Sequence, residues 1–244
     1  MFEILLSVPS FEQKQLSKYS KNIVSSVKAS GGIALLHNHS KRSFLAIAVS
    51  EKEKEFFKAL ISDMIVNFVI EVYKYNFFKE KFYVNENEIT EAFLNAISIF
   101  DSDADKEIIK GEIEFGDEIL IDSFYFFKLT GLQSKWRKTI EIISQNQIQN
   151  NKFTMIEVIK YLTETSDNNV SVAKVSLNEK NIKLENFEEK RQFKRTINGR
   201  SKFFSELIKL NPARITITLD SEDGEDDVLP LLNQIFDDKI YVLN

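Results

Sequence analysis

The chain has no cysteine and is poor in proline, glycine and histidine. Its 244 residues contain no Cys, three Pro, seven Gly and two His. Without Cys there is no disulfide framework, no Cys-ligated zinc, no iron–sulfur cluster and no thiol nucleophile. The low Gly and Pro content excludes collagen-like and Pro-rich chains. The chain also lacks a Walker loop, a GxGxxG motif and a GxSxG nucleophile elbow.

An excess of positive charge and a long apolar run are also missing. Lys and Arg number 32 against 37 Asp and Glu, so the formal net charge is −5, whereas a nucleic-acid-binding domain is commonly basic. No basic region precedes the apolar residues 1–8, which argues against a signal peptide. The most apolar window, 56–73, contains Lys58, Asp63 and Glu71, which would make membrane insertion costly. We therefore expect a soluble cytoplasmic protein without a transmembrane segment.

Hydrophobic residues are abundant, at 43% of the chain with 21 Phe, which indicates a globular protein with a large core. Apolar and turn patterns predict a strand over 2–8, a helix over 10–28 and a hairpin from 33–36 to 44–49 with a turn at 37–42. Periodic apolar stripes then predict helices at 57–72, 88–100, 104–114, 117–129, 133–146 and 152–164. After a turn at 167–169 we expect strands at 170–175 and 182–184, a basic helix at 187–209, a strand at 214–219, a helix at 229–236 and a strand at 239–243.

This order of elements predicts an α+β fold in which N-terminal and C-terminal β-containing segments flank a central helical bundle. We expect an N-terminal β-α-β-β segment over 1–50, a helical domain over 51–166 and a C-terminal α/β segment over 167–244. The two terminal segments either share one sheet, which is the more economical arrangement, or form two separate small sheets.

Three groups of side chains are candidate metal ligands. His37 and His39 would face the same side of a strand, but they fall in a polar turn that we expect to be exposed. Asp101, Asp103, Asp105 and Glu112 fit positions 1, 3, 5 and 12 of a calcium loop, yet Lys106 stands where that loop needs Gly. A run of carboxylates over 220–227 would suit a divalent cation, although such runs are more often solvated loops. We expect no cofactor.

Two clusters of cations are the strongest candidate binding sites. One surrounds a single tryptophan, and the other forms a basic stretch in which Arg191, Lys194 and Arg195 would share a helix face. Either cluster suits a polyanion or an acidic partner surface. The candidate residues are Lys135, Trp136, Arg137, Lys138, Lys190, Arg191, Lys194, Arg195, Arg200 and Lys202.

Several stretches resemble the YtxC-like sporulation protein family of spore-forming Firmicutes. Residues 123–129, SFYFFKL, are similar to the family's GFxxFRLK stretch, with Lys128 in place of Arg and Thr130 in place of Lys. Residues 157–162 resemble its helix ending in LLKYF, and 212–218 and 235–240 resemble its final strand, helix and strand. Family members carry a Cys cluster that this chain lacks. The resemblance implies a sporulation setting and no particular reaction.

The sequence thus favours a non-enzymatic protein that binds a protein partner or a nucleic acid through basic surface patches. The alternative is a metal-dependent hydrolase or nuclease that uses the carboxylate clusters at 101–112 and 220–227. A third reading is a subunit of a homo-oligomer that pairs through exposed Phe-rich faces.

Overall fold

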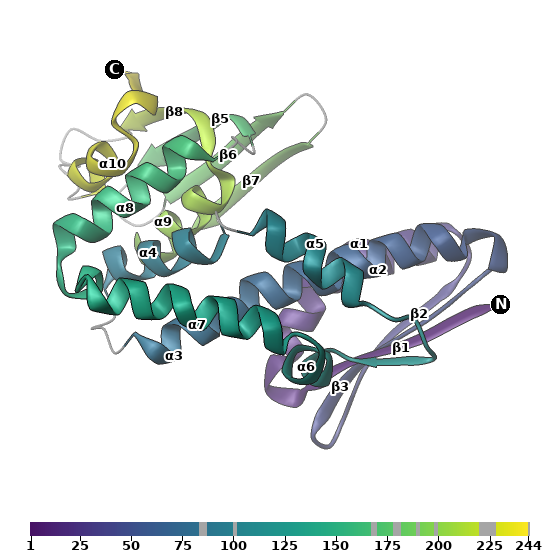
Figure 1. Ribbon diagram of the computed structural model, residues 1–244. Coiled ribbons are helices and arrows are strands. Elements are labelled where there is room, and N and C mark those ends of the chain that lie inside the picture. The colour runs from purple at the N-terminus through teal and green to yellow at the C-terminus, as the bar shows by residue number, and fades with distance from the viewer. Residues whose placement is uncertain are drawn as a thin grey trace. The chain divides into compact units, whose positions relative to one another are not determined.

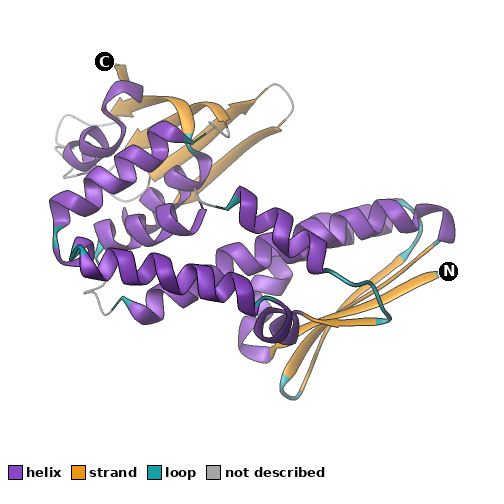
Figure 2. Ribbon diagram, viewed as in Figure 1, coloured by secondary structure: helices purple, strands orange, loops and turns teal. Residues whose placement is uncertain are grey.

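The computed structural model describes residues 1–82, 87–99, 102–166, 170–177, 182–188, 191–197, 200–219 and 228–243. It confirms the α+β fold, since the chain contains many helices together with two separate sheets (Figure 2). The chain forms two compact units. The N-terminal unit comprises Met1–Phe78 and Asp101–Ile140, and the C-terminal unit comprises Lys79–Phe100 and Glu141–Asn244.

The N-terminal unit contains a four-stranded sheet in the order β2-β3-β1-β4. Its strands are β1 (Phe2–Pro9), β2 (Ile33–His39), β3 (Arg42–Val49) and β4 (Glu118–Leu120). β3 is antiparallel to β1 and β2, while β4 runs parallel to β1. The predicted hairpin is confirmed, but its strands extend further, so that only Ser40 and Lys41 form the turn. Ser40 has a φ of 53° there, a left-handed conformation that a short polar side chain tolerates.

One face of this sheet is buried and the other is not. Ile4, Leu6 and Val8 of β1 alternate with outward-facing neighbours, as a half-buried strand requires. Helix α1 (Gln13–Ala29) packs on the buried face through an apolar stripe that includes Leu16 and Ile23, and Figure 1 shows it running beside β2 and β3.

The remaining helical segments of the N-terminal unit include a run of ring contacts from Phe68 through Tyr73 and Tyr125 to Trp136. They are η1 (Ser10–Glu12), η2 (Glu51–Glu53), α2 (Lys54–Phe68), the π-helical η3 (Val69–Lys74), the start of α3 (Tyr75–Lys81), α5 (Asp103–Glu112), α6 (Ile121–Ser123), the π-helical η4 (Phe124–Lys128) and the start of α7 (Thr130–Gln145).

The C-terminal unit contains a five-stranded sheet in the order β7-β6-β5-β8-β9. β5, β6 and β7 form an antiparallel meander, and β8 and β9 extend the sheet in parallel with β5. Its elements are α4 (Glu88–Ile99), η5 (Ile148–Asn150), α8 (Lys152–Thr165), β5 (Val170–Leu177), β6 (Ile182–Glu188), β7 (Arg191–Ile197), α9 (Arg200–Leu210), β8 (Pro212–Leu219), α10 (Val228–Phe236), η6 (Asp237–Lys239) and β9 (Ile240–Leu243).

Of the two arrangements left open for the terminal segments, the described strands form two separate sheets. Two expectations about local structure are wrong. Within the predicted helix 117–129, residues Glu118–Leu120 instead form a strand parallel to β1. Within the predicted basic helix 187–209, Arg191–Ile197 pairs with β6 as a hairpin strand. The compact units also follow other boundaries than 1–50, 51–166 and 167–244, since the chain crosses between them near Phe78, Phe100 and Ile140.

A buried ion pair joins three helical segments of the N-terminal unit. The Lys74 side chain is 1% exposed and that of Asp105 is fully buried, and the Lys74 Nζ lies 2.8 Å from Asp105 Oδ2. Trp136 Nε1 donates to the same oxygen at 2.7 Å, and Lys135 Nζ donates to Oδ1 at 3.0 Å. Burial alone would raise the pKa of Asp105, but these donors together hold it below its usual value. The carboxylate therefore links η3, α5 and α7.

We expect Lys74→Met to lower the free energy of unfolding by about 3–5 kcal/mol, because it leaves the Asp105 charge buried without its main partner. Urea unfolding followed by circular dichroism would measure the loss. The matched control is Lys106→Met, which breaks the exposed Lys106–Asp103 pair of 2.8 Å on α5 and should cost less than about 1 kcal/mol. Equal losses in the two variants would contradict the stated role of the buried pair.

Candidate functional site

The four residues of the predicted patch around Trp136 do not lie together on the surface. Trp136 is 2% exposed and belongs to the core, where its indole N–H bonds to Asp105. The expectation that Trp136 contacts a partner is therefore wrong, because the indole N–H points into the core and donates to the buried Asp105 carboxylate. Lys135 is also directed to Asp105, whereas Arg137 and Lys138 are exposed on α7.

The predicted basic stretch 190–202 is distributed over two elements. Arg191, Lys194 and Arg195 lie on β7, Arg200 and Lys202 lie in α9, and Lys190 lies outside the described residues. On a strand, positions 191 and 195 belong to one face and position 194 to the other. Lys194 is paired in register with Glu185 and Arg191 with Glu188. The stretch is therefore not the single basic helix face that the sequence predicts.

The predicted metal ligands are not gathered into a site in the described part of the chain, where no three His, Asp or Glu side chains could hold an ion together. His37 and His39 are exposed on β2. Asp103 and Asp105 begin a helix instead of a loop, and Asp105 is occupied by Lys74, so the calcium-loop interpretation is wrong for these residues. Asp101 and the acidic run 220–227 lie outside the described residues.

The structure instead reveals a line of lysines on α1. Lys14, Lys18, Lys21 and Lys28, here called the lysine ridge, are all exposed. At 3.6 residues per turn they fall on the side opposite the buried stripe of Leu16, Ser20, Ile23 and Val27. The 17 residues of α1 include no Asp or Glu. The sequence carried this signal, since the spacing of four, three and seven residues marks one helix face.

The lysine ridge is long and only lightly neutralised by the described residues. From Lys14 to Lys28 it spans about 21 Å at a rise of 1.5 Å per residue. Lys18 is 3.8 Å from Glu71, whose carboxylate also accepts a hydrogen bond of 2.7 Å from Tyr19. Lys41 adds a further exposed cation near the start of the helix, because its carbonyl accepts a bond from Ser10 N–H. This geometry can bind an extended anion.

A second polar cluster sits where β1 and β3 meet the helices. The Arg42 guanidinium donates to both Asp122 oxygens, at 2.6 and 3.1 Å, and to Ser7 Oγ. Burial tends to raise the pKa of Asp122, but the Arg42 hydrogen bonds lower it overall. Nearby, Tyr73 O–H donates to Glu12 Oε2 at 2.7 Å, and burial raises the pKa of both Glu12 and Tyr73. Because these groups bond mainly to one another, we interpret the cluster as structural.

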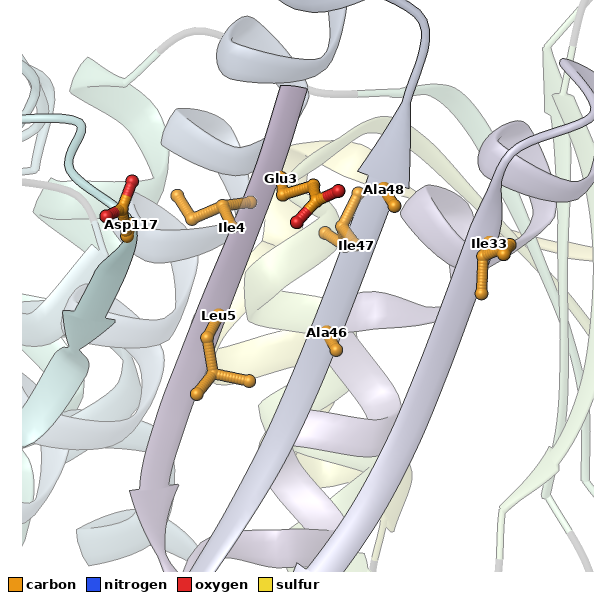
Figure 3. A pocket seen from close by; sticks show the side chains of 8 residues that line it. All are labelled: Glu3, Ile4, Leu5, Ile33, Ala46, Ile47, Ala48 and Asp117. Atoms are coloured by element: carbon orange, nitrogen blue, oxygen red, sulfur yellow. The ribbon is translucent and has the colours of Figure 1, made fainter. Parts of the chain in front are cut away.

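A shallow groove of about 500 Å³ lies on the exposed face of the four-stranded sheet. Figure 3 shows that its floor is formed by the small residues Ala46 and Ala48 of β3, with Glu3 and Leu5 of β1 on one side and Ile33 of β2 on the other. Its lining also includes the carboxylates of Glu3 and Asp117, which Figure 3 shows on opposite sides of β1. These two groups do not converge on one point as the polar groups of a ligand pocket do.

No family model, curated protein or solved structure matches the chain. Among the residues that the structure describes, no helix combines the length and apolarity needed to cross a membrane.

The raised pKa of Glu12 predicts a pH dependence. Its folded-state pKa lies above the unfolded value near 4.5, so the folded state favours the protonated acid. The contribution of protonated Glu12 to the free energy of unfolding is fully present below pH 4.5, and it is lost as pH rises through the folded-state pKa. We expect Glu12→Gln, which keeps an acceptor for Tyr73, to gain stability relative to the native chain between pH 4.5 and 7. Urea unfolding across that range measures this, with the exposed Glu3→Gln as control; a difference that is constant with pH would contradict it.

Proposed function

We propose that this chain is a non-enzymatic binding protein that attaches to the phosphate backbone of a nucleic acid, with the lysine ridge of α1 as its principal contact. The observation that carries this proposal is the continuous line of four exposed lysines on a helix that contains no acid. Lysines that neutralise phosphates release condensed counterions, which supplies most of the affinity of sequence-independent binding.

The charge of the whole chain makes this proposal depend on the lysine ridge. With a net charge of −5, the overall field of the protein repels polyanions, so binding requires the local concentration of cations on α1. An anionic membrane is less well suited as the partner. A surface-lying helix inserts its apolar face between lipids, and the apolar stripe of α1 is already buried against the sheet.

The basic residues predicted from sequence remain candidates for further contacts, each within its own unit. The exposed Arg137 and Lys138 lie on α7 in the N-terminal unit, and Arg191, Lys194 and Arg195 lie on β7 in the C-terminal unit. A cytoplasmic location goes with the proposal, since nucleic acid is accessible there. Membership of the YtxC-like family and a role in sporulation are also proposed, on the strength of the stretches at 123–129 and 157–162.

The test is the salt dependence of binding to a fluorescent DNA duplex, measured by anisotropy. For the native chain we expect the logarithm of the association constant to fall linearly with the logarithm of the salt concentration. The triple variant Lys14→Ala, Lys21→Ala and Lys28→Ala should bind more weakly and reduce that slope by about 3, since each lost phosphate contact contributes about 1.

The matched control removes three exposed lysines elsewhere, as Lys52→Ala, Lys81→Ala and Lys152→Ala, with the same change in net charge. It should leave the slope nearly unchanged. Absence of binding by the native chain would refute the proposal, and equal losses in both triple variants would refute the ridge as the contact. A loss confined to Arg191→Ala, Lys194→Ala and Arg195→Ala would transfer the site to β7.

A further inference from the structure

The outermost strand of the N-terminal sheet exposes apolar side chains on both of its faces. Ile33 and Leu35 of β2 are each 61% exposed on the face that carries the groove in Figure 3, and Leu36 is 40% exposed on the opposite face. The next strand, β3, is better covered on both faces: Leu45 and Ile47 on the covered face are in the core, and Ala46 and Ala48 on the groove face are half-buried. The unsatisfied apolar surface is therefore centred on β2 itself.

This strand also lacks the features that normally protect a sheet edge. Proteins block edge strands with Lys or other charges, Pro, bulges or short length. β2 has seven residues, Ile33–His39, with no Lys, Arg, Asp, Glu or Pro among them, and it pairs with β3 in an unbroken register. The other edge strand, β4, has only three residues.

A partner on the edge explains these exposures better than a partner on the groove. A molecule bound in the groove over Ala46 and Ala48 would cover Ile33 and Leu35. It would leave Leu36 exposed to solvent, because Leu36 lies on the other face of the sheet. A strand added alongside β2 would place side chains next to both faces and would also bond the outward-pointing backbone groups.

We propose that β2 pairs antiparallel with β2 of a second copy of this chain, with Leu36 opposite Leu36 across a twofold axis. This register pairs all seven residues, with Ile33 opposite His39, Ala34 opposite Asn38 and Leu35 opposite His37. Because no Asp, Glu, Lys or Arg occurs in the strand, identical copies bring no such charges into opposition. The same patch then serves both copies, as a twofold interface requires.

The size of this interface predicts a weak dimer. Seven strand residues extend about 23 Å, and the sheet with its single helical layer is about 20 Å deep. The contact is thus about 460 Å² per copy, or roughly 900 Å² in total, which is below the size of a stable specific interface and within the range of weak, transient association. The axis is perpendicular to the sheet, so both α1 helices and both lysine ridges lie on the same side of the dimer.

The absence of Cys from the chain permits a direct test by cross-linking. In Leu36→Cys, the two thiols would sit on directly opposed residues, whose Cα atoms are about 4.5–5.5 Å apart in an antiparallel pair, within disulfide range. We expect a covalent dimer after mild oxidation. Asn38→Cys, on the same face of the strand, would place its Cα atoms about 14 Å apart and should remain monomeric on a non-reducing gel.

Sedimentation velocity gives an independent readout. The native chain should shift from monomer to dimer across micromolar concentrations, and Leu35→Lys, which adds an edge charge at an exposed site, should remain monomeric. The control Ile142→Lys changes a residue that is 59% exposed on α7 and should still dimerise. A native chain that is monomeric throughout, a dimer unaffected by Leu35→Lys, or cross-linking through Asn38 in preference to Leu36 would overturn the proposal. No nucleic acid is present in either experiment, so the outcome is separate from that of the proposed function.

Discussion

The charge distribution on the surface of the N-terminal unit depends on the packing of α1, which has one buried apolar face and one exposed basic face. Its apolar stripe, with Leu16, Ile23 and Val27, is buried against the sheet, and that burial fixes the rotation of the helix about its axis. The lysines are then held outward in one line, because helix geometry allows no other position for residues 14, 18, 21 and 28. Hydrophobic packing, which has no charge preference of its own, thereby organises the electrostatics of the surface.

Much of the local structure could be predicted from the sequence, and the failures share a cause. Alternation and helical periodicity located β1, α1, β3, α8 and α10, because burial on one face imposes the period directly. β4 and β7 were missed, since a three-residue strand carries almost no period and a charged hairpin strand resembles a polar helix. In both, pairing with a strand already in place decides the conformation, and this non-local contact overrides the local propensity.

The candidate sites were harder to predict because charge in a sequence does not indicate burial. Asp105 and Lys135 both appeared to be surface groups, yet Asp105 is fully buried and binds Lys74, 31 positions earlier. Trp136 was assigned to a binding patch on the strength of its cationic neighbours, although its indole N–H turns inward. The lysine ridge was not among the predicted sites, although the sequence could have indicated it: the periodic stripe of Leu16 and Ile23 identifies the opposite face of α1, where the lysines lie, as solvent-exposed.

The brevity of β4 has a consequence for how far association through sheet edges can proceed. A molecule with two long open edges could recruit copies at both and grow into a fibre. Here the edge opposite β2 offers only Glu118–Leu120 and begins with a carboxylate, too short and too charged to template another strand. Pairing two molecules along β2 would occupy the long open edge of this sheet, so association through the N-terminal sheet would stop at a dimer.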